Sequence, residues 1–340
     1  MQKRERVIRA LKFECPDRAP RMLWALPGVR MDRGRELEDM ERRFCPDISG
    51  VGNAAKSSRA RGDSAAVGTY VDAWGCVWSV AERGVVGEIK DPILADWQTL
   101  ADWQPPWELL DQADLKGAED RCRTTDCFVL AGTETRPFER MQFLRGTENL
   151  LLDLAGGAPE AIRLRDLLHA FYVREMRMWA KTAVDGVCFM DDWGSQTALL
   201  ISPAMWRELF KPLYAEYCAI LHEAGKFAFF HSDGHIEAIY PDLVEIGVDA
   251  VNSQLFCMDI EELGRLYRGR ITFWGEIDRQ HLLPFGTPEQ VREGVRRVRR
   301  ALDDGRGGVI AQCEWGLHDP AANIAAVFEA WDEPMGRKGN

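Results

Sequence analysis

The residues of this sequence best suited to catalysis are His231 and Asp233, in the run His-Ser-Asp-Gly at 231–234. The run follows a short apolar stretch, 227–230, that predicts a buried β-strand. Two residues apart on extended backbone, the imidazole and the carboxylate point to one face, and Gly234 permits a sharp turn after them. Such a pair can bind a metal ion, or the carboxylate can orient the imidazole for proton transfer. The structural alternative is a hydrogen bond that only fixes the turn.

Four other predicted strands also end in polar residues, in the runs 191–196, 252–254, 275–278 and 312–314. The C-terminal ends of parallel barrel strands share one rim, and catalytic groups come from that rim. We therefore expect the five runs to form one site. The candidate catalytic residues are Asp191, His231 and Asp233, and the candidate substrate-binding residues on these runs are Gln196, Asn252, Gln254 and Glu276.

In two of these runs, the sequence leaves open which residue faces the mouth or which role a residue has. Asp191 and Asp192 are adjacent, so only one can face the barrel mouth while the other caps a helix or a loop amide; we assign the catalytic role to Asp191. Cys313 follows an apolar strand, where a thiol is usually buried and inert. Its place on the same rim as His231 makes it a candidate metal ligand nevertheless.

Tryptophan is abundant, with 12 residues, and its ring makes a good wall for a flat ligand. Trp24 and Trp274 lie on predicted strands, and we expect both to contact substrate. Asp72 and Trp74 belong to an excursion between strands, 72–78, that reads as a hairpin arm. That arm either is purely structural or closes over the mouth and contributes Asp72 and Trp74 to substrate binding.

The elements that must position these residues alternate regularly from residue 159 onward. Helices are predicted at 159–183, 203–224, 236–246, 260–267, 288–302 and 320–331, and strands at 186–190, 227–230, 250–251, 271–274 and 309–311. Earlier in the chain, the pattern predicts a helix at 3–13 and strands at 22–26 and 128–131. Short apolar strands joined by long helices indicate a parallel sheet, and their number favours a (β/α)8 barrel of the TIM type, with an N-terminal excursion over the mouth. The rival open sheet lacks the Gly-x-Gly-x-x-Gly loop that would accompany a dinucleotide.

Composition and charge argue against several classes of protein. The formal net charge of -11 and the absence of a Lys/Arg-rich cluster argue against a nucleic-acid partner, and no apolar run is long enough for a membrane span. The nine cysteines are odd in number and form no Cys-x-x-Cys pair, which favours the cytoplasm over a secreted disulfide framework. We expect residues 1–340 to form a single domain.

Several segments, taken as an ordered set, resemble the uroporphyrinogen decarboxylase-like superfamily. They lie at 4–7, 16–20, 72–78, 191–196, 201–203, 230–234, 271–278, 284–289 and 319–324. The resemblance covers nearly the whole chain and implies a (β/α)8 barrel. The superfamily contains porphyrinogen decarboxylases and zinc-dependent methyltransferases that exchange methyl groups with corrinoid proteins.

The resemblance is closer to the methyltransferase branch. The decarboxylases carry an arginine-rich loop near the N-terminus that grips the porphyrinogen carboxylates, whereas the matching stretch here, 22–30, has only Arg21 and Arg30 nearby. The methyltransferases bind zinc through His-x-Cys-Gly and a second Cys near the end of the chain. His231 matches the His, Asp233 replaces the first Cys, and Cys313 matches the second.

The resemblance therefore implies a metal site at His231, Asp233 and Cys313 that takes zinc or another divalent metal. It further implies methyl transfer to or from a corrinoid on a separate partner protein, because the sequence lacks a corrinoid-binding Asp-x-His-x-x-Gly run. The tryptophan-rich mouth favours demethylation of a small methoxy or methylamine-type substrate.

Two other function classes stay open. The first is a metal-free decarboxylase in which Asp72, Asp191 or Asp233 protonates a carbanion after loss of carbon dioxide. It requires a basic pocket for an acidic substrate, and few arginines are predicted near the rim. The second is a non-catalytic barrel that only docks a corrinoid protein, which would not need five polar strand ends.

Overall fold

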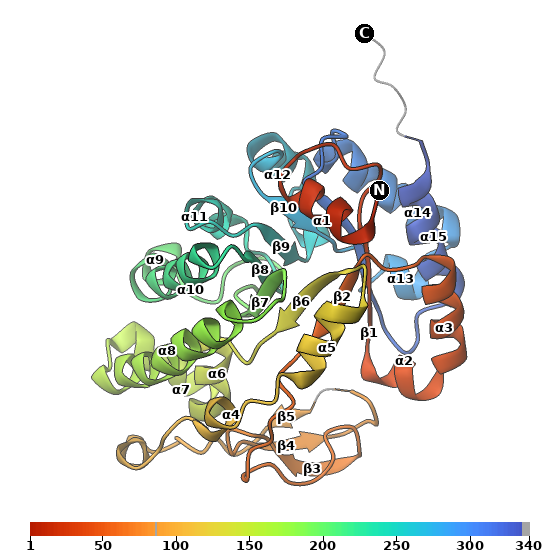
Figure 1. Cartoon of the computed structure of the whole chain (residues 1–340). Helices are drawn as coiled ribbons and strands as arrows, with labels where there is room; N and C mark the ends of the chain where they lie inside the picture. The colour runs from red at the N-terminus through yellow and green to blue at the C-terminus, as the bar shows by residue number, and fades with distance from the viewer. Residues whose placement is uncertain (86, 335–340) are drawn as a thin grey trace.

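The computed structural model describes residues 1–85 and 87–334, and its centre is an eight-stranded sheet rolled into a barrel (Figure 1). The strand order is β1-β11-β10-β9-β8-β7-β6-β2, and each paired neighbour runs parallel. The strands are β1 (Arg21–Ala25), β2 (Ile48–Val51), β6 (Phe128–Gly132), β7 (Gly186–Met190), β8 (Phe227–Ser232), β9 (Ala250–Ser253), β10 (Thr272–Trp274) and β11 (Val309–Trp315). The predicted α/β barrel is confirmed.

Helices surround the strands and connect them (Figure 1). They are α1 (Lys3–Leu11), α2 (Pro27–Asp32), α3 (Gly34–Arg43), α4 (Glu108–Asp111), α5 (Lys116–Thr124), α6 (Pro137–Arg145), α7 (Thr147–Gly156), α8 (Pro159–Ala180), α9 (Pro203–Leu209), α10 (Lys211–Glu223), α11 (Tyr240–Glu245), α12 (Ile260–Tyr267), α13 (Leu282–Phe285), α14 (Pro288–Leu302) and α15 (Ala321–Asp332), with short 3-10 turns at Trp97–Ala101, Glu237–Ile239 and Leu255–Cys257. Among the described residues, no helix combines the length and apolar character that crossing a bilayer requires.

Side chains on the strands alternate between the barrel interior and the surrounding helices. The interior holds its own apolar cluster, which includes Ile48, Phe128, Cys188, Phe229, Trp274 and Ile310. Val7 and Leu11 of α1 join that cluster and close the N-terminal end of the barrel. The opposite, C-terminal end is where polar residues follow the strands, so it forms the mouth.

The sheet is nearly closed, because β1 and β2 stand at its two ends without a ladder between them. Asp47 spans this seam: its N–H donates to the carbonyl of Arg21 at 2.9 Å, and its Oδ2 accepts the N–H of Arg21 at 2.7 Å. The same carboxylate binds the guanidinium groups of Arg6 and Arg18. A buried, multiply bonded carboxylate thus replaces the missing strand pairing at the bottom of the seam.

Two of the predicted helices are divided in the structure. The predicted helix 203–224 is two helices, α9 and α10, which break at Phe210 just before Pro212. The predicted helix 236–246 is a 3-10 turn followed by α11, with Pro241 in the first turn of α11. In both cases the proline lacks an N–H and forces a new helix start.

The excursion is a three-stranded antiparallel sheet formed by β3 (Gly68–Val71), β4 (Val77–Val80) and β5 (Glu88–Ile89). It lies on the mouth side of the barrel, where the N–H of Gly84 bonds within the excursion to Ala65 and Arg83 pairs with Asp32 of α2 (Figure 1). The hairpin prediction for 72–78 is confirmed, because residues 72–76 form the turn between β3 and β4 and residues 77–78 begin β4.

Glu175 of α8 fixes the turn between β6 and α6 behind the mouth. Its carboxyl group is buried and accepts the N–H of Glu134 at 3.0 Å and the hydroxyl of Thr135 at 2.8 Å. Burial raises the pKa of Glu175 to about 7, above the 4.5 of a free glutamate. The folded state therefore holds this proton more tightly than the unfolded state does.

We expect the free energy of unfolding to fall between pH 5 and pH 8 as Glu175 ionises, by up to about 3 kcal/mol. The sign follows from linkage, because a raised carboxyl pKa stabilises the fold only below the folded-state pKa. Denaturant unfolding of the wild type and Glu175→Gln at both pH values measures it. The variant should lose the part of this fall that is due to Glu175, while Glu276, whose pKa burial also raises to about 7, still contributes; equal slopes in the two proteins would contradict the assignment.

Candidate metal centre

Three side chains that can bind a metal ion meet at the mouth, namely those of Asp192, His231 and Asp233. The Nε2 atom of His231 lies 3.6 Å from Asp192 Oδ1 and 3.6 Å from Asp233 Oδ1. His231 is on β8 with its side chain toward the barrel interior, and Asp192 follows the neighbouring strand β7. The predicted pair of His231 and Asp233 is therefore brought together, with Asp192 as its third member.

A close approach of two loops holds the carboxylates in place. Gly234 has a φ of +80°, and a Cβ atom there would lie 2.0 Å from the carbonyl oxygen of Gly194. The Gly194 N–H donates to the Asp233 carbonyl at 3.1 Å, and the Asp233 N–H donates to Asp192 Oδ1 at 2.8 Å. The sharp turn predicted at Gly234 is confirmed, and its function is to let the β7 and β8 loops touch.

His231 is oriented by Asn252 of β9. The Nδ1 atom of His231 lies 2.6 Å from Asn252 Oδ1, and the Asn252 amide donates in turn to the carbonyl of Trp274 and, at 3.2 Å, to Gln312 Oε1. This arrangement places the proton on Nδ1 and leaves the Nε2 lone pair facing the carboxylates, as in metal-binding histidines. Burial lowers the pKa of His231, but Asp192 and Asp233 outweigh that effect and raise it overall.

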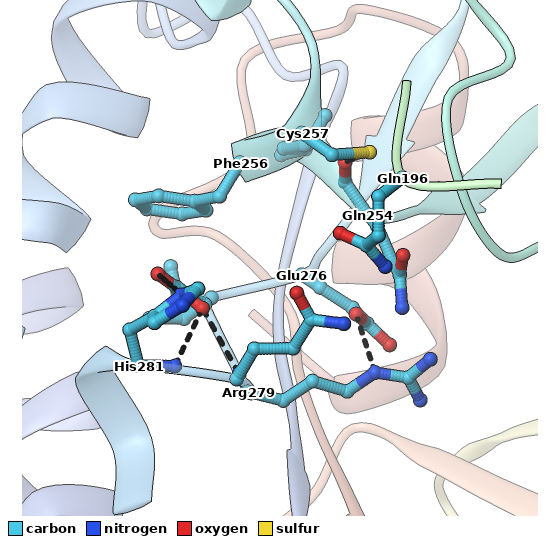
Figure 2. A pocket seen from close by; sticks show the side chains of 11 residues that line it. Gln196, Gln254, Phe256, Cys257, Glu276, Arg279 and His281 are labelled. Atoms are coloured by element: carbon cyan, nitrogen blue, oxygen red, sulfur yellow. Dashed lines mark hydrogen bonds and ion pairs between the residues drawn. The ribbon is translucent and has the colours of Figure 1, made fainter. Parts of the chain in front are cut away.

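Arg279 lies across the mouth from His231 and bonds to several acids. Its guanidinium donates to Asp233 Oδ2 and, at 2.9 Å, to Glu314 Oε1, and its Nε is 3.6 Å from Glu276 Oε2 (Figure 2). One guanidinium thus faces three carboxylates, and Asp192 adds a fourth negative charge nearby. The mouth has an excess of negative charge that a cation would balance.

The residues present fit a divalent metal ion. Asp233 Oδ1 is buried and, among the described residues, has no hydrogen-bond partner, which is costly unless something binds it. Ligand atoms of a tetrahedral zinc site with bonds near 2.1 Å stand about 3.4 Å apart, close to the 3.6 Å separations here. Asp192, His231 and Asp233 are therefore the residues that would hold the ion.

Asp191 has a structural role, so the catalytic role predicted for it is corrected. Its fully buried carboxylate accepts the N–H groups of Phe138 and Glu139 at 2.7 and 2.6 Å and the hydroxyl of Tyr214 at 2.6 Å. Successive strand residues point to opposite faces, so Asp191 faces the helices when Asp192 faces the mouth. The sequence predicted that one aspartate of the pair faces the mouth and the other caps a helix or a loop amide. Both roles are present, but Asp192 faces the mouth and Asp191 is the capping residue.

Cys313 does not reach the metal centre, and its prediction as a ligand is corrected. It lies within β11 in register with Leu23 of β1, and both side chains belong to the outer cluster that packs against helices. The lumen side of β11 instead carries Ile310, Gln312 and Glu314. Burial raises the pKa of the Cys313 thiol well above its usual range, consistent with an inert core cysteine.

Asp72 and Trp74 do not line the mouth and are likewise corrected. Asp72 accepts the N–H groups of Trp74 and Cys76 at 2.9 and 2.8 Å, which fixes the turn of the excursion. Trp74 is buried, packs on Phe171 with ring centroids 4.9 Å apart, and lies under the guanidinium of Arg140. The structural alternative for this hairpin is the one observed.

The other predicted contacts fall into two groups. Trp24 and Trp274 form the floor below His231, with the Trp24 ring centroid 5.3 Å from that of His231 and 5.1 Å from that of Trp274. Gln196, Gln254 and Glu276 line a pocket beside the metal centre (Figure 2). No ligand contact has been tested for any of them, so their role in substrate binding stays a prediction.

Sequence reasoning missed several residues of the mouth: Asp192, Arg136, Glu139, Arg279 and Glu314. Glu139 is partly buried near Asp192, and its burial followed by the Asp192 charge raises its pKa. Asp192 and Glu314 lie within the predicted polar runs 191–196 and 312–314 but were not assigned to the site, and Arg279 directly follows the run 275–278. The rim thus carries two arginines, Arg136 and Arg279, which the sequence did not single out.

The fold and the site together define a (β/α)8 barrel protein with a carboxylate-rich centre at the C-terminal ends of its strands. Residues 2–334 match the family model described as uroporphyrinogen decarboxylase (URO-D), and the chain belongs to that family. No curated protein sequence matches the chain significantly.

Among solved structures, the chain is similar to a methyltransferase from Methanosarcina mazei. The TM-score is 0.72 at 14% identity, and the match covers 98% of both chains. A xylanase from Gloeophyllum trabeum gives a TM-score of 0.41 at 11% identity, over 65% of this chain and 81% of that one. At such identities the first likeness supports the shared fold, and the second adds no argument.

Proposed function

We propose that this chain is a metal-dependent methyltransferase that moves a methyl group between a small methylated substrate and a corrinoid on a separate partner protein. The observation that carries the proposal is the Asp192, His231 and Asp233 group, with its unpartnered buried Asp233 Oδ1. Membership of the URO-D family and the structural similarity to a methyltransferase support it.

A divalent ion such as zinc, when bound, supplies Lewis acidity toward a substrate heteroatom. Asn252 keeps the Nε2 atom of His231 directed at the carboxylates, and Arg279 fixes Asp233 through Oδ2 so that Oδ1 stays turned toward His231. Trp24 and Trp274 close the floor of the site against water. With two carboxylates and no thiolate, the ligand set is hard and also suits metals other than zinc.

In the demethylating direction, the bond between the methyl carbon and its oxygen or nitrogen breaks, and the heteroatom keeps the electron pair. Cobalt(I) of the corrinoid supplies the pair for the new carbon–cobalt bond. The partner has to deliver its cofactor to the open, C-terminal face of the barrel, where Asp192 and Asp233 remain partly exposed.

The alternative, a metal-free decarboxylase, gains one observation from the structure. Arg136 stands at the same rim, 3.9 Å from Glu139, and its buried Nε has no hydrogen-bond partner among the described residues. Such a guanidinium can receive a substrate carboxylate. The acid cluster around His231 has no evident task in a metal-free decarboxylation, so we rank that function second.

Methyl transfer can be measured with cob(I)alamin as a soluble acceptor, by its spectral conversion to methylcobalamin. The purified chain is assayed with methoxyarenes and methylated amines, first loaded with zinc, cobalt or manganese and then after chelation. We expect turnover that disappears on chelation and returns with metal. Failure of every donor with the loaded protein, together with metal-independent carbon dioxide release from an arylcarboxylate, would support the decarboxylase instead.

A further inference from the structure

A small pocket opens directly beside the metal centre, and nothing in the arrangement so far accounts for its chemistry. Figure 2 shows the carboxylate of Glu276 between Gln254 on one side and Arg279 on the other. The cavity measures about 170 Å³, which suits a small molecule. Its lining residues are Gln196, Gln254, Leu255, Phe256, Cys257, Glu276, Ile277, Asp278, Arg279, Gln280 and His281.

The pocket is negatively charged in spite of Arg279. Glu276 and Asp278 line it, and the guanidinium of Arg279 is already bonded to Asp233 and Glu314 outside it. A divalent ion in the metal centre would balance the charges of Asp192 and Asp233 only. Glu276 and Glu314 would then still face one guanidinium, while Asp278 lies 3.3 Å from the His281 ring, so negative charge remains in excess.

Glu276 carries the inference, because its carboxylate is buried without a full set of partners. Glu276 is 2% exposed, and its Oε1 atom has no hydrogen-bond partner within the described part of the chain. The other oxygen, Oε2, stands 3.6 Å from Arg279 Nε, beyond hydrogen-bond distance. Burial raises the pKa of Glu276 to about 7, and its ionised form is destabilised unless a cation or a donor reaches it.

The rest of the wall suits a cation that carries methyl groups. Phe256 offers an aromatic face and Leu255 and Ile277 offer apolar surface, while Gln196 and Gln254 add amide oxygens and no charge. Aromatic rings combined with carboxylates are the usual recognition elements for alkylated ammonium groups. We propose that this pocket binds a small organic cation, a methylated ammonium compound, with its charge against Glu276 and Phe256.

An anionic or neutral ligand fits less well. A carboxylate would have to share Arg279 with Asp233 and Glu314, which the guanidinium already binds, and would lie beside Glu276 and be repelled by it. A neutral methyl ether would leave Glu276 Oε1 buried and unpaired. The identification of this cation as the methyl donor rests on the proposed function, whereas its binding does not.

Isothermal titration calorimetry at constant ionic strength tests the binding directly, with the chelated and the metal-loaded full-length protein at pH 8. The probes are tetramethylammonium, choline, its uncharged carbon isostere 3,3-dimethylbutan-1-ol, and benzoate. We expect the two cations to bind and the isostere to bind at least about tenfold more weakly. Glu276→Gln should weaken cation binding at least about tenfold, and Phe256→Leu several-fold.

The matched control is Glu261→Gln, because Glu261 of α12 is an exposed acid paired with Arg297 and does not line the pocket. It should leave binding unchanged. Stronger binding of benzoate than of tetramethylammonium, no cation binding by the wild type, or unchanged binding in folded Glu276→Gln and Phe256→Leu would each overturn the inference. Cation binding without methyl transfer to cob(I)alamin would support the cation pocket and contradict the proposed function.

Discussion

Replacing His231 by alanine should reduce bound divalent metal from about one ion per chain to less than one tenth, and methyl transfer by about a thousandfold or more. The imidazole is the only nitrogen ligand of the group, and its Nε2 lies between the two carboxylates. Asp192→Asn and Asp233→Asn should have similar effects, since each keeps its shape but loses the charge that holds the cation. Metal is measured by plasma mass spectrometry after loading and exhaustive dialysis.

Cys313→Ser is the matched control for these variants. Cys313 is buried in the outer cluster, so its replacement should leave metal content and methyl transfer within about twofold of the wild type. The opposite pattern, in which Cys313→Ser loses the metal and Asp192→Asn retains it, would contradict the assigned ligand set and restore the one expected from the sequence alone.

Replacing Asp191 by alanine should destabilise the fold by about 3–5 kcal/mol, the largest stability effect we expect of a residue near the mouth. The change leaves the N–H groups of Phe138 and Glu139 and the hydroxyl of Tyr214 buried without an acceptor. It also removes the carboxylate from the positive end of α6, which begins at Pro137. Thermal and denaturant unfolding measure the loss.

Two further measurements separate this structural role from a catalytic one. Tyr214→Phe leaves the carboxylate its two backbone partners but removes one donor to it and the acceptor of Trp193 Nε1, so it should cost about 2 kcal/mol, less than Asp191→Ala. Folded Asp191→Ala, assayed well below its melting temperature, should still bind one metal ion per chain. Loss of metal binding at full stability would show that Asp191, rather than Asp192, faces the centre.

The corrections of Asp191 and Cys313 have one physical origin. In a strand the side-chain direction alternates with a period of two, so a shift of one residue moves a group from the mouth to the helices. Asp191 and Asp192 are indistinguishable by type and differ only in this parity. Cys313 was placed on the rim because β11 was expected to stop at residue 311, but it runs on to Trp315.

Long-range pairing also explains the missed residues. Arg136 and Glu139 come from the turn and helix after β6, and they meet Asp192 only because β6 and β7 are neighbours in the barrel. Arg279 had a local signal, since it continues a polar run at a strand end. Its importance lies in contacts with Asp233 and Glu314, which are 46 and 35 residues away in the chain.

The sequence by itself determined the barrel, the rim that carries the polar groups, and the pairing of His231 with Asp233, because alternating apolar runs and the two-residue spacing are local properties of the chain. Only the tertiary structure decided that Asp192 completes the group, that Cys313 faces away, and that Glu276 is left buried beside an empty volume. Those outcomes depend on strand register, on where each strand ends, and on which loops touch at Gly194 and Gly234. Contacts between distant segments set all three, and no local pattern encodes them.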